Sequence, residues 1–268
     1  MSRSGDVDVT SGARRAGDHP VVEKGARLGY AMSGLIHLLI GWIAIKVAWD
    51  IDGGSDDADQ SGALATVANT TTGPILLWLA VIGFALLALW QLTEAIVGRH
   101  GGGFSDRAKA AGKMVMYAVI AWSAYRVTQR AGDSSEESTQ SFTAQIMDQP
   151  GGRILIGLIG VGIVAGGGHH VYKGWTCRFL EDLDEHPGRV VEVAGRAGYV
   201  AKGLSLVVVG GLFVTAAVSS RASEAGGLDA ALKMVRDQPF GPFLLTIVAV
   251  GIAAYGFYSF GRARHAKL

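Results

Sequence analysis

The sequence predicts an all-α integral membrane protein with six transmembrane helices, arranged as three parallel two-helix repeats around a pseudo-three-fold axis. Three observations lead to this fold class. First, 49% of the 268 residues are apolar and only 18% are charged, whereas a soluble domain carries about 25% charge. Second, several runs of ~17 to 22 residues are almost free of charge, which is the length that crosses ~30 Å of hydrocarbon as a helix. Third, the start of the first apolar run returns near the end of the chain.

Six apolar runs are the predicted spans. In chain order they cover about residues 28–49, 74–97, 112–128, 154–175, 198–219 and 241–261. The third run is the shortest, and its ends carry Lys113 and Arg126, whose long side chains can extend to the membrane interfaces. Residues 1–24 are polar and lack periodicity, so we expect a flexible cytoplasmic tail there.

The distribution of Lys and Arg orients the spans. If the N-terminus is cytoplasmic, most of these cations fall in cytoplasmic segments. The outer loops then hold only Arg130, Arg153, Arg221, Lys233 and Arg236. Such a bias is typical of bacterial membrane proteins. We therefore expect a multi-pass protein of the cell (inner) membrane with both termini in the cytoplasm.

An internal repeat divides the chain into three units, 25–98, 105–175 and 190–264. The stretch Arg27–Leu35 (RLGYAMSGL) returns at Arg196–Leu204 as RAGYVAKGL. Each second span begins at a glycine and has another ten residues later. The starting glycines are Gly73, Gly152 and Gly241, and the later ones are Gly83, Gly162 and Gly251. Before each second span lies a short amphipathic segment, at 63–68, 142–147 and 228–235. Because each unit contains two spans, all three share one orientation.

These motifs resemble a bacterial family of six-span membrane proteins. The likeness rests on the three-fold repetition, the Arg-x-Gly-Tyr-x-x-x-Gly-Leu opening and the Gln-Pro-Phe-Gly turn at Gln238–Gly241, and it covers about residues 25–264. The family is common in actinobacteria, consists of three tandem two-helix repeats and is a domain of unknown function. The second repeat departs from it, with Gly112-Lys113 in place of Gly-Tyr. The resemblance thus implies an architecture but no activity.

Ionisable and polar groups at membrane depth are the candidate site residues, because they are costly to place there. They are His37, Gln91, Glu94, His169, His170, Lys173 and Arg262. The repeat makes Glu94, Lys173 and Arg262 equivalent, so they either converge at the cytoplasmic ends of the second spans or extend separately to the headgroups. Gln91 lies one turn before Glu94 and can share its helix face.

The three histidines allow two interpretations. His37 is either a neutral side chain hydrogen-bonded across a helix interface, or a proton carrier or haem ligand. His169 and His170 project about 100° apart on a helix, so they do not easily bind one metal together. Small residues should let helices pack closely. The expected packing glycines are Gly34, Gly83, Gly162, Gly166 and Gly251.

Composition excludes several classes of function. The net charge of +1 argues against a nucleic-acid-binding protein. The single Cys177 excludes an internal disulfide and a cysteine zinc cluster. No metal motif or cofactor motif is present, and no nucleophile, base and orienting group lie together as an enzyme would need.

We therefore expect a non-enzymatic scaffold or regulatory component of the cell membrane, which contacts the lipid bilayer and either a membrane protein partner or further copies of itself. Two alternatives stay open. One is a small-solute or ion transporter or channel that uses polar groups of the second and fourth spans. The other is a redox protein that binds haem or quinone through the intramembrane histidines.

Overall fold

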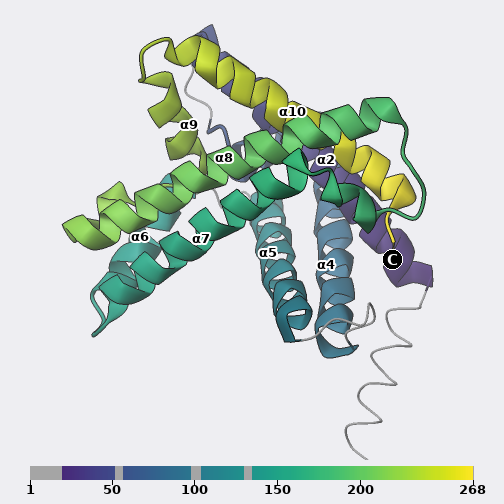
Figure 1. The fold of residues 1–268 in the computed structure, drawn as a ribbon, viewed down its shortest axis with the longest axis horizontal. Coiled ribbons are helices and arrows are strands. Elements are labelled where there is room, and N and C mark those ends of the chain that lie inside the picture. The colour runs from purple at the N-terminus through teal and green to yellow at the C-terminus, as the bar shows by residue number, and fades with distance from the viewer. Residues whose placement is uncertain (1–19, 52–56, 98–103, 130–134, 268) are drawn as a thin grey trace, which may run out of the picture.

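The described part of the chain is built from helices. A computed structural model describes residues 20–51, 57–97, 104–129 and 135–267. Its long helices are α2 (Pro20–Ala48), α4 (Gly73–Val97), α5 (Phe104–Thr128), α7 (Gly152–Trp175), α8 (Arg189–Ser219) and α10 (Gly241–His265). The short elements are α3 (Gln60–Ala68), α6 (Ser135–Met147), α9 (Leu228–Arg236) and the 3₁₀ turns η2 (Arg178–Asp182) and η3 (Ala222–Glu224). Figure 1 shows their arrangement.

Five of the described helices, α2, α4, α7, α8 and α10, are long and apolar enough to cross a membrane. The sixth expected span, 112–128, lies within α5, which does not meet that standard. Its first half carries Asp106, Arg107, Lys109 and Lys113. The expected tail also needs a correction. Residues 1–19 lie outside the described residues, but 20–24 form the first turn of α2, which continues without a break into the apolar run.

The helices pack most extensively in three pairs, α4 with α5, α7 with α8, and α10 with α2. Each pair joins the last long helix of one repeat to the first of the next, and α10 with α2 joins the third repeat to the first. In Figure 1 the α4–α5 pair points downward, and the α7–α8 pair extends to the left. Within the repeats, α2 also packs against α4 and α8 against α10. By contrast, α5 and α7 pack against each other little or not at all.

The repeated glycine at the start of α4, α7 and α10 has a structural reason. A Cβ atom at Gly73, Gly152 or Gly241 would lie 2.2, 1.7 or 1.6 Å from a carbonyl oxygen near the end of the preceding short helix. Each glycine N–H also donates to the carbonyl three residues earlier, over 2.9, 2.9 and 2.7 Å. The short helices α3, α6 and α9 contain the three predicted amphipathic segments. Each therefore ends against the start of the following long helix, where a side chain would not fit.

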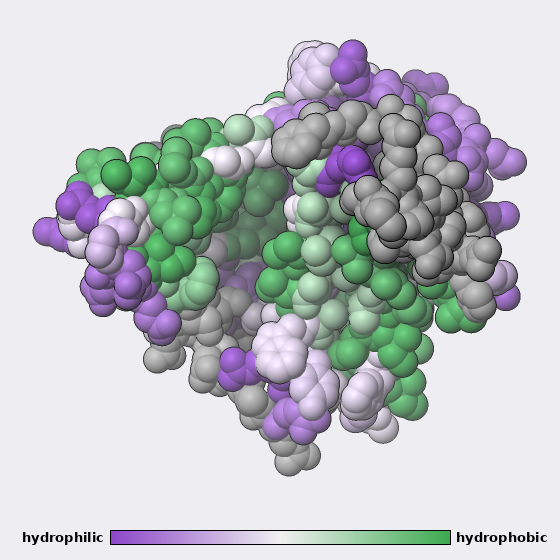
Figure 2. All heavy atoms as spheres, turned by 90° about the horizontal axis from the view of Figure 1, so that it is seen from below, coloured by the Kyte–Doolittle hydropathy of each residue, from purple (hydrophilic) through white to green (hydrophobic). Residues whose placement is uncertain are grey.

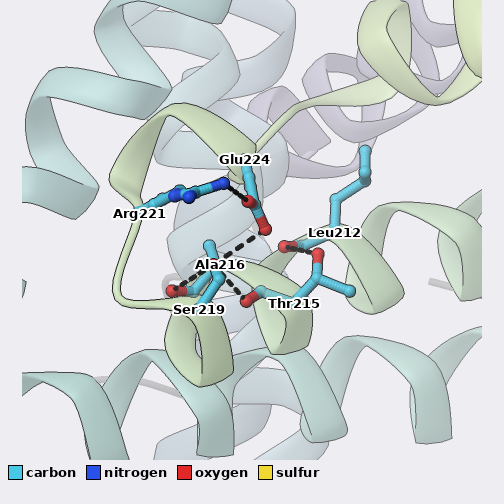
Figure 3. Close-up of polar contacts among 6 residues, drawn as sticks. All are labelled: Leu212, Thr215, Ala216, Ser219, Arg221 and Glu224. Carbon is cyan, nitrogen blue, oxygen red and sulfur yellow. Dashed lines mark hydrogen bonds and ion pairs between the residues drawn. The ribbon is translucent and has the colours of Figure 1, made fainter.

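The turn after α8 is held by a carboxylate (Figure 3). Ser220 adopts a left-handed conformation with φ 61°. The Arg221 N–H donates back to the carbonyl of Ala216 over 3.1 Å, which ends the helix. Glu224 then accepts a hydrogen bond from the Ser219 hydroxyl over 2.8 Å and pairs with Arg221 at 3.5 Å. These contacts turn the chain toward α9.

The two ends of the bundle differ in character. Toward the end that carries α3 and α9, the core is mostly apolar and fully buried, with the carboxylates of Asp59 and Asp229 buried beside it. Its largest side chains are Ile40, Ile43, Val47, Leu64, Leu232, Leu245 and Ile252. Toward the end that carries η2, the buried cluster contains Phe179, Leu183, Tyr199, Tyr255 and Tyr258, and the partly buried charges of Lys173, Asp182 and Arg262 lie beside it. We call these the α3/α9 end and the η2 end.

Glycine pairs explain why two repeats are packed internally. A Cβ at Gly29 would lie 2.6 Å from the Gly83 carbonyl oxygen, so the backbones of α2 and α4 are in close contact there. In the third repeat, a Cβ at Gly198 would lie 2.4 Å from the Tyr255 nitrogen, and one at Gly251 would lie 2.3 Å from Ala201 Cβ. Each pair lets two helix backbones approach where a larger residue would hold them apart.

The same glycines occur in the second repeat without a partner helix. A Cβ at Gly112 or Gly162 would meet no described atom within 4 Å, and the same holds at Gly166. The close packing expected at Gly162 and Gly166 instead falls on other glycines of α7, Gly160 and Gly167. Their Cβ atoms would lie 2.8 and 2.7 Å from carbonyl oxygens of α8. The remaining expected glycine, Gly34, packs closely against α10, 2.9 Å from the Gly256 oxygen.

The unpacked faces of α5 and α7 define what we call the α5–α7 seam. On α5 it comprises Gly112, Val115, Met116 and Val119, which share a helix face by their spacing and are exposed. On α7 it comprises Gly162, Gly166 and His169, opposite the face that packs on α8. Figure 2 shows apolar side chains on both sides of a recess between the α7–α8 arm and the rest of the molecule.

The glycine pairs predict a matched contrast between equivalent positions. Gly198→Ala should lower the free energy of unfolding by about 1 to 3 kcal/mol, because the new methyl group is forced into the α8–α10 contact. Gly112→Ala should change it by less than about 1 kcal/mol, and upward, because it only adds helix propensity. Thermal unfolding of both variants in the same detergent checks this. Equal destabilisation would mean that α5 is packed at Gly112.

Candidate functional site

A cluster of charges closes the η2 end. The carboxylate of Asp182, the last residue of η2, accepts a hydrogen bond over 2.6 Å from the ammonium group of Lys173 on α7, and the two groups form a salt bridge. The guanidinium group of Arg262, from α10, lies 3.8 Å from the same carboxylate oxygen. All three side chains are less than a third exposed. Asp182 therefore joins the ends of α7 and α10. Lys173 and Arg262 occupy equivalent positions in the second and third repeats and are 89 residues apart in the sequence.

Aromatic rings lie beneath these charges. Arg262 stacks over the Tyr30 ring at 4.3 Å, and Lys173 lies 5.7 Å from the Tyr199 ring centroid. Such cation–π contacts strengthen when they are shielded from water. Tyr30 and Tyr199 are the tyrosines of the two Gly-Tyr motifs. The repeated opening of the first and third units thus places an aromatic ring under a cation of the preceding unit.

The tyrosines of α8 and α10 form a continuous aromatic core with η2. The ring of Phe179 lies 5.2 Å from that of Tyr199 and 5.1 Å from that of Tyr258, and Tyr255 packs 5.2 Å from Tyr199. All four residues are buried. The Tyr258 hydroxyl donates to the Phe179 carbonyl over 3.3 Å. This core fixes the position of η2, and with it Asp182.

A second polar contact lies deeper in the bundle. The Lys202 ammonium group, from α8, is 3.1 Å from His37 Nε2 on α2 and 4.1 Å from the Tyr255 ring centroid. His37 Nδ1 lies 2.7 Å from the Ser33 carbonyl oxygen. Because a carbonyl only accepts, Nδ1 must carry the proton, and Nε2 then accepts from Lys202. The geometry thus assigns a neutral histidine with both ring nitrogens engaged.

The other histidines are placed differently. His170 Nδ1 lies 2.9 Å from the Gly166 carbonyl oxygen, and its ring packs 5.7 Å from that of Tyr199. His169 is exposed on the seam face of α7. The structure thus separates the two neighbours, as their helical spacing predicts. Among the described residues, no group of three or more His, Cys, Asp or Glu could hold a metal ion.

The expected meeting of the repeat-equivalent residues takes another form. Lys173 and Arg262 do come together, but on Asp182. Glu94 is buried on α4, one turn from Gln91, which is also buried. Sequence reasoning missed Asp182 because it lies in the short connection after α7, outside every predicted span. The one available signal was its position within ten residues of Lys173.

A third cation belongs to the cluster. Lys113 of α5 is close enough to Asp182, Arg262 and Lys173 to interact electrostatically with all three. It occupies the position that is tyrosine in the other two repeats. Burial by itself would raise the pKa of Asp182, but the positive charges of Arg262 and Lys173 outweigh burial, and Lys113 adds to them. The pKa of Asp182 is therefore lowered.

Together these groups form a polar column that ends inside the bundle. It leads from Asp182 past the tyrosines to the Lys202–His37 contact. Beyond His37, the same face of α2 continues with Ile40, Ile43 and Val47, which are fully buried in the apolar core. The arrangement can hold an anion or relay a proton at the η2 end, but among the described residues of α2 the polar column does not continue past His37 toward the α3/α9 end.

Comparison with known proteins agrees with this repeat structure. Residues 28–98, 108–176 and 197–266 each match the family described as Domain of Unknown Function (DUF1206). The chain belongs to this family. Each matched DUF1206 segment covers one pair of long helices, α2 with α4, α5 with α7, and α8 with α10. An uncharacterised protein of Bacillus subtilis (strain 168), YxxB, is 30% identical over 250 residues, which cover 90% of each chain. No solved structure matches the chain.

The lowered pKa of Asp182 predicts a pH-dependent contribution to stability. Its ion pairs should stabilise the fold fully above the carboxyl's unfolded pKa of about 3.9, and this contribution should disappear as the pH falls through the lower folded value. At pH 7, Asp182→Asn should cost about 2 to 4 kcal/mol, because it leaves Arg262 and Lys173 without a carboxylate.

Unfolding temperatures of the native protein and of Asp182→Asn, measured from pH 7 to pH 3, check this prediction. The difference between the two proteins should be constant above about pH 5 and shrink below about pH 4. Asp184→Asn, two residues away and exposed, is the control and should behave like the native protein. A difference independent of pH would contradict the role given to the Asp182 charge.

Proposed function

We propose that the chain crosses the cell (inner) membrane six times, with both termini in the cytoplasm and the three repeats related by a pseudo-three-fold axis. Two observations support this. First, α5 stands in the repeat where α2 and α8 stand, and its Lys113 and Arg126 can extend to opposite interfaces. Second, the three helix pairs follow one rule. In each pair the last long helix of one unit packs against the first long helix of the next, and this includes α10 with α2. The Lys and Arg bias supports a cytoplasmic η2 end.

Cysteine labelling tests this topology, in a Cys177→Ser background that removes the native thiol. An impermeant reagent outside the cell should label Thr71→Cys and Asp148→Cys, which lie in the α3–α4 and α6–α7 connections. It should label Asp184→Cys only after permeabilisation. The two outer positions are separated by α4 and α5. If Asp148→Cys is protected while Thr71→Cys reacts, α5 does not span.

We further propose that the protein is a non-enzymatic scaffold or regulatory component of the cell membrane, and that it accommodates another membrane constituent in the α5–α7 seam. The glycines of the seam carry this proposal. Where Gly29 meets Gly83, and where Gly198 and Gly251 meet the facing helix, the repeat is packed. Gly112 and Gly162 occupy the same positions but face open space. This leaves a narrow, apolar pair of helix faces for a lipid, a protein helix or a second copy of the chain.

The polar groups support a binding role better than catalysis. Asp182, Lys173 and Arg262 pair with one another, and Lys202 pairs with His37. A nucleophile with an adjacent base, which acyl or group transfer requires, does not occur among these described contacts. The apolar layer beyond His37 also argues against a continuous channel, whose lining would have to be polar along its whole length.

One observation favours transport as a second candidate. The Lys202–His37 contact is an ionisable pair within the membrane, reached by polar groups from one side, and such pairs serve proton relays in transporters. Protein in liposomes with a trapped pH dye discriminates between the proposals. Proton uptake driven by a membrane potential, and lost in His37→Leu, would support transport and contradict the scaffold proposal. For haem, both nitrogens of His37 are already engaged, so no observation favours that alternative.

Disulfide formation across the seam tests the proposed binding surface. In native membranes, Gly112→Cys with Gly162→Cys should stay reduced when oxidant is added, because another constituent keeps α5 and α7 apart. The positive control is Gly157→Cys with Ala217→Cys, since the Cβ atoms at these positions lie 3.5 Å apart, within the range of a disulfide. If the seam pair cross-links as fast as the control, the chain closes its own seam and the proposal fails.

A further inference from the structure

The seam and the charge cluster meet, which suggests what occupies the seam. Lys113 follows Gly112 on α5, at one wall of the seam, and lies within electrostatic range of Lys173 at the end of α7. The open groove therefore has two apolar walls and a cationic end. A ligand that fits it must be anionic at one end and apolar along the rest.

The cluster has too few negative charges of its own. Lys113, Lys173 and Arg262 share the carboxylate of Asp182, and the cations outnumber the carboxylates even when Glu94 of α4 is counted. Lys113 is exposed and forms no ion pair with a described residue. Arg262 Nε is buried and has no hydrogen-bond partner among the described residues. A buried donor without a partner is costly, so the site is completed best by an anionic group with several acceptor oxygens.

The position of the site limits the source of that anion. The seam face of α5 begins at Gly112, beside Lys113, and continues with Val115 and Met116, which are 55% and 43% exposed. An inorganic anion would leave these side chains and Gly162 uncovered, whereas an acyl chain would cover them. Positive-inside orientation places the η2 end at the cytoplasmic leaflet, whose anionic lipids bind basic sites between membrane helices.

We propose that the α5–α7 seam binds one anionic phospholipid of the cytoplasmic leaflet. Its phosphate lies against Lys113, Lys173 and the Nε edge of Arg262, and an acyl chain lies between the glycine faces of α5 and α7. This inference rests on the proposed function and names the membrane constituent that the seam accommodates. It also explains why the second repeat has lysine where the other two have tyrosine. At the open position a cation can reach the lipid, while the tyrosines at the closed positions pack beneath Arg262 and Lys173.

Native mass spectrometry of the full chain tests the proposal. Purified protein is mixed with phosphatidylglycerol, with phosphatidylcholine of the same acyl chains, or with inorganic phosphate. We expect one phosphatidylglycerol per chain, retained at least about five-fold more than phosphatidylcholine, since a lysine at an anionic surface contributes about this factor. Inorganic phosphate should not displace it. Equal retention of the two lipids, displacement by phosphate, or a lipid-free dimer would each overturn the proposal.

Two matched variants locate the binding site. Lys113→Gln should lower phosphatidylglycerol retention about five-fold, whereas Lys109→Gln, one turn away on the same helix, should leave it within about two-fold. Lys109 is 62% exposed and pairs with Asp106, so its removal changes the same net charge away from the seam. If both variants lose the lipid equally, the attraction is general surface charge and the site is wrong.

Cross-linking of the seam cysteines distinguishes a failure of the lipid assignment from a failure of the proposed function. Adding phosphatidylglycerol, but not phosphatidylcholine, to detergent-purified protein should slow the cross-linking of Gly112→Cys with Gly162→Cys. If the pair stays reduced in native membranes but phosphatidylglycerol has no effect, the lipid assignment fails and the proposed function stands. If the pair closes in native membranes, both fail.

Discussion

The carboxylate of Asp182 is the interaction on which the η2 end depends. It receives Lys173 from the second repeat and Arg262 from the third, and these cations lie over the rings of Tyr199 and Tyr30. The short 3₁₀ turn η2 thereby links α2 and α8, the first helices of the first and third units, with α7 and α10, the last helices of the second and third units. Burying several charges at this depth is tolerable only because they are paired with one another and stacked on aromatic faces.

The glycines set the other constraint, which concerns how closely helices approach. Where both members of a pair are covered, as at Gly29 and Gly83, the repeat closes on itself. The second repeat keeps the glycines but not the contact, and it replaces the motif tyrosine by Lys113. These two departures occur in the same unit and at the same level. We regard them as one adaptation, which fits the binding role that we propose for the seam.

Much of the architecture could be predicted from the sequence, because its signals are local and repeated. Apolar length predicts α2, α4, α7, α8 and α10. The Gln-Pro and glycine turns predict where α7 and α10 begin, and the spacing of apolar residues predicts α9. The family match to three segments agrees with the three units read from the repeated motif. The membrane crossing of α5 stays a prediction, because its charged first half weakens the signal that apolar length gives elsewhere.

The site was less predictable, because its contacts join residues that no sequence pattern links. The expected membrane depth of His37, Lys173 and Arg262 made them candidates, but it could not show that His37 meets Lys202 or that two cations share Asp182. The glycine pattern predicted close packing at Gly162, yet whether a partner helix is present there depends on how whole units pack. Periodicity shows which residues share a helix face. It does not show what covers that face.

We expect α5 and α7 to stand apart in the membrane. The distance between spin labels at the exposed residues Val119 of α5 and Leu158 of α7, measured by pulsed electron paramagnetic resonance in lipid bilayers, tests it most directly. If the helices stand apart, one distance distribution is expected. It should be longer than packed helices allow at an interaxial distance of about 8 to 10 Å, and it should be the same in bilayers and in native membranes. A distribution centred at the packed distance would contradict it.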